Sequence, residues 1–184
     1  MKLKPILIGL ITAAAIALPA HAQLIYGLAI NGGGIVGTKT NDSAPAGNVG
    51  ELLTTQVAAA GAVAGAASTA SANVTSVSLT AGDWIVQGTC SLIWTGVTAT
   101  VQRCGLGTTT DVQASQAGGS GIGTDPLTVI IGTFGTTLSG TTALSTPVAR
   151  VSVASTTTIY LVAGMTYSAG SFTQYGSIRA WRVR

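Results

Sequence analysis

Histidine is almost absent from this sequence of 184 residues, which contains only His21. His21 lies in an N-terminal segment with the pattern of a removable leader, so the rest of the chain carries no imidazole. A Ser-His-Asp triad, a Cys-His pair and a histidine-containing zinc site all need that group. The sequence therefore argues against these catalytic classes and this kind of metal centre, and we expect no enzymatic activity.

Charged side chains are also scarce, at 7% of the chain against about a quarter in ordinary soluble domains. From Gln23 onward there are six basic and five acidic residues, which leaves a net charge of +1. Nucleic-acid binding depends on a strongly basic surface, so we expect no nucleic-acid partner. A short basic strand near the C-terminus is more typical of a solvated edge or a subunit contact. The six basic residues are Lys39, Arg103, Arg150, Arg179, Arg182 and Arg184.

The five carboxylates are too scattered to predict a catalytic pair or a metal site. A glycosidase needs two carboxyl groups that face each other across a cleft, whereas most of these lie in or beside loop-like segments. Asp83 belongs to a turn, where aspartate is ordinary, and no loop has the ligand spacing of a calcium site. We expect no metal, no cofactor and no catalytic residue among Asp42, Glu51, Asp83, Asp111 and Asp125.

Threonine, serine and 25 glycines take the place of charge. Threonine is β-branched and suits exposed strand faces, while glycine serves turns and bulges. The clearest strand signal lies in Asn73–Trp94, where two strand-like runs are joined at Thr80–Asp83. The second run alternates with the period of two that is typical of a half-buried strand. Two tryptophans lie on its apolar face, so we expect them in the core rather than on a sugar-binding platform. This face consists of Trp84, Val86, Gly88, Cys90, Leu92 and Trp94.

The rest of the chain supplies further runs, and we expect about eight strands in two sheets. Leu127–Phe134 has the composition of a strand, and Gly135–Pro147 that of a loop. The fold predicted is all-β, a jelly-roll-type β-sandwich with an extended N-terminal arm. The domains predicted are a signal-peptide-like apolar leader or anchor at 1–22, an extended glycine-rich arm at 23–46 and the sandwich at 47–184. The other expected strands are Asn48–Val57, Val148–Ala154, Ile159–Ala163 and Phe172–Val183.

The two cysteines, Cys90 and Cys104, leave two alternatives. If Thr95–Gly96 forms a two-residue turn, Cys90 faces Val101 and the two thiols point to opposite faces of the hairpin. A bulge or a longer loop would bring them together, and an exported protein would permit a disulfide. Two separate thiols and a Cys90–Cys104 bridge are therefore both open.

The N-terminus has the three parts of a secretory signal peptide. Met1–Lys4 is basic, Pro5–Ala20 is apolar, and Ala20-His21-Ala22 forms a small-residue cleavage pattern. The apolar run is short for a membrane span. We expect cleavage before Gln23, with an uncleaved anchor as the alternative.

Four stretches, spread over residues 41–184, resemble structural proteins of tailed phages and prophages. In that group such a module resembles a small jelly roll of the C1q or tumour-necrosis-factor kind. The resemblance implies a place at the end of a tail fibre or on the capsid surface, usually as a homotrimer. It carries no functional residues to this chain, because the matching stretches encode strands and turns. They are Asn41–Glu51, Asn73–Trp84, Thr157–Val162 and Gly176–Arg184.

The resemblance implies a non-enzymatic bacteriophage virion protein, a head or tail appendage or decoration. Its expected partners are other copies of the chain, other virion proteins and a host-surface glycan. A virion protein assembled in the cytoplasm needs no secretory leader, so a second function stays open. It is an exported bacterial surface or periplasmic module of phage origin that binds a glycan or a protein.

Overall fold

A computed structural model describes the backbone at residues 30–31, 34–35, 43–111 and 127–184, and the side chains at 43–111 and 139–184. The chain divides into two compact units, Met1–Asp42 and Ser43–Arg184. In the first unit, β1 (Ile30–Asn31) and β2 (Gly34–Ile35) pair as an antiparallel ladder. The expected leader lies outside the described residues, as does most of the expected arm.

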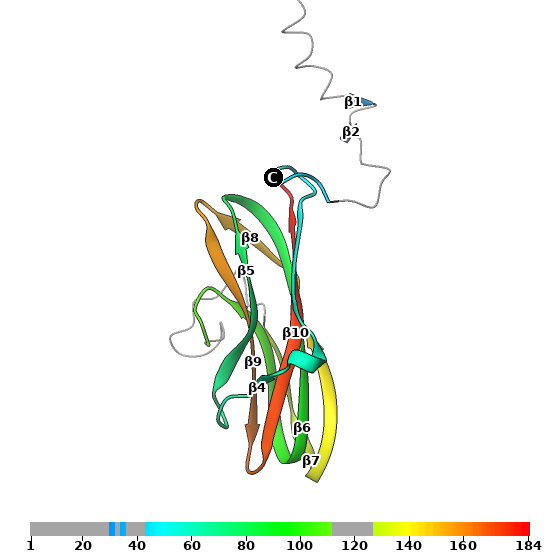
Figure 1. Cartoon of the computed structure of the whole chain (residues 1–184), viewed down its shortest axis with the longest axis vertical. Coiled ribbons are helices and arrows are strands. Elements are labelled where there is room, and N and C mark those ends of the chain that lie inside the picture. Colours follow the sequence, from blue (N-terminus) through cyan, green and yellow to red (C-terminus); the bar gives the residue numbers. More distant parts are fainter. Residues whose placement is uncertain (1–29, 32–33, 36–42, 112–126) are drawn as a thin grey trace, which may run out of the picture. The chain divides into compact units, whose positions relative to one another are not determined.

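The second unit is built from antiparallel strands, and its described residues contain no α-helix. The predicted all-β, sandwich-type fold is confirmed (Figure 1). A single 3₁₀ turn, η1, interrupts the alanine- and glycine-rich segment before the central strands. The elements are β3 (Leu52–Val57), η1 (Ala59–Gly61), β4 (Val63–Ala64), β5 (Ser71–Leu79), β6 (Gly82–Gly107), β7 (Leu127–Ser145), β8 (Ala149–Val153), β9 (Thr157–Tyr167) and β10 (Ser171–Arg182).

Strand β6 is folded back on itself, and this bend creates the two layers. The Cα atoms of Cys90 and Cys104 are 5.8 Å apart, whereas 14 residues of straight strand would span about 46 Å. Gly96 lies midway between them and has a φ of +65°, a left-handed conformation that glycine adopts without strain. The neighbouring strands follow the bend, because β10 pairs with residues 84–95 of β6 and β9 with residues 99–107.

The strand pairs divide the curled sheet into two layers, which share the two halves of β6. In the β10 layer, β3 and β4 pair with β10, β10 pairs with the first half of β6, and β7 and β8 pair with the other edge of that half. In the β9 layer, β5 pairs with β9, and β9 pairs with the second half of β6, whose other edge pairs with the start of β7. This arrangement is a curled, jelly-roll-type sandwich.

Inward-facing apolar side chains fill the space between the layers. Trp84 is fully buried and Trp94 is 7% exposed, so the placement of both in the core is confirmed. Strand β10 alternates in the same way, because Ile178 and Ala180 are buried while Trp181 is only half-buried. Each strand thus contributes one apolar face to a shared core, as the period-two pattern predicted.

Two local predictions were wrong. Thr95–Gly96 does not join two neighbouring strands, because Trp94 pairs with Phe172 and Gly140 rather than with Val97. Gly135–Pro147 is not a loop for most of its length, because β7 continues to Ser145. Both errors have one cause. The strands that pair with β6 follow its bend, and this long-range pairing holds segments in strand conformation although their local sequence is typical of turns.

Candidate functional site

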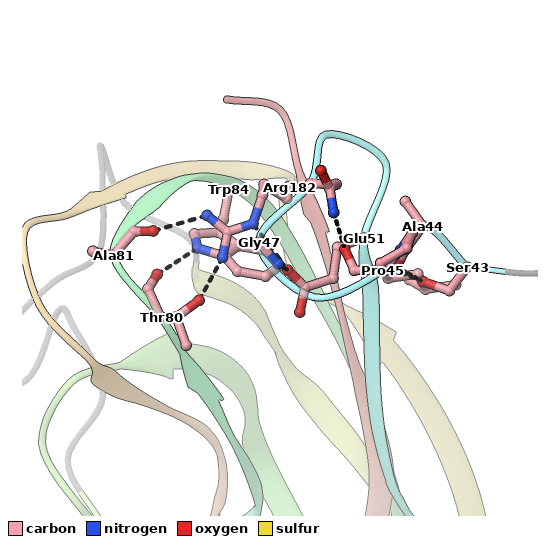
Figure 2. A network of polar contacts seen from close by, with 11 residues as sticks. Ser43, Ala44, Pro45, Gly47, Glu51, Thr80, Ala81, Trp84 and Arg182 are labelled. Atoms are coloured by element: carbon pink, nitrogen blue, oxygen red, sulfur yellow. Dashed lines mark hydrogen bonds and ion pairs between the residues drawn. The ribbon is translucent and has the colours of Figure 1, made fainter. Parts of the chain in front are cut away.

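The best-defined polar cluster lies at the end of the sandwich where β10 terminates (Figure 2). Arg182 is 5% exposed and follows the inward parity of β10. Its Nε donates to Oε2 of Glu51 at 2.9 Å, and its other nitrogens donate to the carbonyl of Ala81 at 2.8 Å and to the hydroxyl of Thr80. The guanidinium carbon lies 4.2 Å from the ring centroid of Trp84, whose Nε1 donates to the carbonyl of Thr80 at 2.9 Å. Arg182 therefore joins the residue before β3, the first strand residues of β6 and the turn before β6.

Glu51 is held as a carboxylate in this cluster. Burial opposes its ionisation, but the N–H of Gly47, at 2.8 Å from Oε2, and the guanidinium of Arg182 hold its pKa below the usual value. The backbones run together as well, because the N–H of Arg182 donates to the carbonyl of Glu51 at 2.9 Å. At neutral pH this side chain is an ionised structural partner rather than a proton donor.

Asp83 forms a second cluster on the outer surface of the same end. A hydrogen bond from Ser152 and the nearby Arg150 and Arg184 lower its pKa from 3.8 to about 2. Its Oδ2 accepts from Arg150 at 2.9 Å and from Arg184 at 2.8 Å. Asp83 also pairs with Arg184 through the backbone, at 3.0 Å from N to O. This carboxylate fixes two arginines whose side chains are 57% and 70% exposed.

The remaining carboxylates do not meet these two. Oδ1 of Asp111 accepts from the N–H of Asn73, and Oδ1 of Asn73 accepts from the N–H of Asp111, both at 2.8 Å. Asp42 and Asp125 lie outside the described residues. Within the described part of the chain, no three side chains of the histidine, cysteine or carboxylate type converge as metal ligands.

The structure joins Cys90 and Cys104 in a disulfide, and both residues are fully buried. The alternative with a two-residue turn at Thr95–Gly96 put the two thiols on opposite faces of a hairpin, and that turn is not formed. In the bent strand, each cysteine instead points inward from its own layer. The bridge therefore ties the two halves of β6, and with them the two layers, across the core.

The outer surface of the β10 layer carries most of the described cationic groups. We call it the Trp181 face and define it by Ile85, Arg150, Arg179, Trp181 and Arg184. Trp181 pairs with Ile85, and Ile85 pairs with Arg150, so these three lie side by side across neighbouring strands. Arg179 is exposed and points to the same side of β10 as Trp181, two residues away. Three arginines and one aromatic side chain therefore share this surface.

The strand pattern of the sequence could have indicated that Arg182 is buried, although the count of charged residues could not. Arg182 has the same parity in β10 as Ile178 and Ala180, so an arginine at the end of that apolar face must either leave the core or find partners inside it. The partners, Glu51 and Thr80, are far away in the sequence, and only the fold brings them together.

Comparison of the chain with known proteins found no similar protein. No family model matches the chain, and neither a curated protein nor a solved structure matches it. Among the residues that the structure describes, no helix has the length and apolar character to cross a membrane.

Proposed function

We propose that the chain is a non-enzymatic structural protein of a tailed-phage particle, a head or tail appendage that works as a homotrimer. The observation that carries this proposal is that the described acidic side chains hold the fold together. Glu51, Asp83 and Asp111 each bind partners within the sandwich and fix strand ends or loops. Side chains committed in this way suit a rigid building block, and the resemblance of residues 41–184 to phage structural proteins supplies the setting.

An apolar patch at the β3 edge supports self-association. Val49 and Leu52 are 51% and 40% exposed, and the segment that contains them runs along the end of β10. Contact with another copy would cover this patch and the outer edge of β3, which pairs with no other strand among the described residues. This edge carries no charge and no proline to block pairing.

The test is the mass of the assembled protein, measured by native mass spectrometry and light scattering. We expect three subunits, and Leu52→Glu should shift the population towards monomers. Ser78→Glu, at an exposed position of β5 in the other layer, is the matched control and should leave the trimer intact. A monomeric native protein would contradict the proposal.

A second function, an exported surface or periplasmic glycan- or protein-binding module, is favoured by one observation. The Cys90–Cys104 disulfide is the kind of bond that forms in oxidising compartments outside the cytoplasm. The intact mass and the N-terminal residue of the protein from its natural source separate the two functions. A start at Gln23 would indicate export, whereas a start at Met1 in material that copurifies with particles would support the virion protein.

A further inference from the structure

Three exposed arginines surround one aromatic side chain on the Trp181 face. Arg179 lies about 7 Å from Trp181 along β10, and Arg150 lies about 10 Å away across two strands. Arg184 reaches the same surface beside Arg150, because both bind Oδ2 of Asp83. Within residues 43–111 and 139–184 the only other arginines are Arg103, in the other layer, and the buried Arg182.

Asp83 positions its two arginines without using up their donors. Arg150 contacts the carboxylate through one Nη atom and Arg184 contacts it through Nε, while their side chains are 57% and 70% exposed. A guanidinium group has five N–H donors, so each arginine keeps donors that face solvent. One carboxylate among three exposed guanidinium groups leaves the surface cationic and partly preorganised.

The middle of the Trp181 face consists of an apolar cross-strand row beside a polar row. Trp181 is half-buried between Ile85 and Leu52, so it borders the exposed apolar patch of Val49 and Leu52. The next cross-strand row places Thr54 and Gln87 on either side of Arg179. An aromatic ring with hydroxyl, amide and guanidinium groups around it matches a sugar ring that carries acidic substituents. The indole ring of Trp181 can stack on the apolar face of the sugar, while the guanidinium groups bind its carboxylate or sulfate groups bidentately.

From this charge complementarity we infer that the Trp181 face binds an anionic glycan. Trp181 stacks on a sugar ring, and Arg179, Arg150 and Arg184 take its acidic groups. The inference rests on the proposed surface role of the protein, since it names the class of glycan that an appendage or surface module would contact. A nucleic acid fits less well, because three arginines neutralise only about three phosphates and such binding depends on many more.

The test uses tetragalacturonic acid, a uronic-acid oligosaccharide, with neutral maltotetraose and a twelve-nucleotide single-stranded DNA as comparison probes. Isothermal titration of the full chain should show binding of tetragalacturonic acid that weakens as salt rises, and no binding of maltotetraose. Arg179→Gln and Trp181→Ala should each weaken binding by about tenfold, because each removes a central anchor. Arg103→Gln removes the same charge from the other layer and should leave the affinity unchanged.

Three results would overturn the inference. The first is no binding of tetragalacturonic acid by a protein whose native mass shows three subunits, and in that case the proposed structural function would stand. The second is equal affinity for the DNA with no effect of Trp181→Ala, which would indicate a general polyanion surface. The third is loss of the trimer in both Trp181→Ala and Arg179→Gln, which would place the Trp181 face between subunits.

Discussion

The guanidinium group of Arg182 lies over the ring of Trp84, with 4.2 Å between the guanidinium carbon and the ring centroid. This contact puts the charge of Arg182 against the largest fully buried side chain of the core. Attraction between a cation and an aromatic face strengthens when both groups are removed from water. This contact and the Glu51 carboxylate together stabilise the buried arginine at the end of the apolar face of β10.

Removal of Glu51 should destabilise the sandwich, because a buried arginine would lose its countercharge. We expect Glu51→Ala to lower the free energy of unfolding by about 3 kcal/mol, measured by urea denaturation. In Glu51→Gln the amide oxygen can still accept from Arg182, so the loss should be smaller. The double variant Glu51→Leu/Arg182→Met should lose less than the sum of the two single variants, since it leaves no unpaired charge. Additive losses would show that the two side chains are not coupled.

Asp83 should make stability depend on pH in the acid range. The carboxyl group has a pKa of about 2 in the folded protein against 3.8 ordinarily, so its ionised form stabilises the fold. That stabilisation is fully present above about pH 4 and is lost as the pH falls through about 2. Unfolding curves at pH 6, 4, 3 and 2 should show a smaller acid-induced loss in Asp83→Asn than in the wild type. Equal losses in the two proteins would contradict stabilisation of the Asp83 carboxylate by Ser152, Arg150 and Arg184.

The Cys90–Cys104 bridge should contribute about 3 kcal/mol to the free energy of unfolding, as expected for a loop of this length. The comparison is the wild type against Cys90→Ala/Cys104→Ala, both by urea denaturation without reductant. Because both sulfurs are buried, the native wild type should also resist reduction by dithiothreitol until urea opens the sandwich. Rapid reduction of the folded protein would show that the bridge is accessible to solvent.

The sequence predicts the strand faces well, because the alternation of apolar and polar residues along a strand indicates which side chains are buried. Trp84 to Trp94 alternates in the sequence and alternates in the structure, and the same is true of Ile178, Ala180 and Trp181. The path of the chain at Gly96 was not predictable from the same signal. Thr95–Gly96 could be interpreted as a two-residue turn, and only the pairing of β6 with β9 and β10 shows that the strand bends together with its partners.

The candidate site was less predictable than the fold for a related reason. Arg182 and Glu51 are separated by 131 residues, and no local pattern connects them. The Trp181 face likewise combines β10 with β8, so the proximity of Arg150 to Trp181 follows from strand order alone. Strand order comes from long-range packing, and neither composition nor periodicity encodes it directly.

Gly176 offers a direct test of the contact between β10 and β6. A Cβ atom at this position would lie 2.1 Å from the carbonyl oxygen of Thr89, a backbone atom of the paired strand that cannot move aside cheaply. Gly176→Ala should therefore separate the strands and lower the free energy of unfolding by about 3 kcal/mol or more. Gly61→Ala is the matched control, because its Cβ would meet only Val57, at 3.9 Å, and should change stability little. If circular dichroism melts found the two variants equally stable, the β6–β10 pairing that places both Arg182 and Trp181 would be wrong.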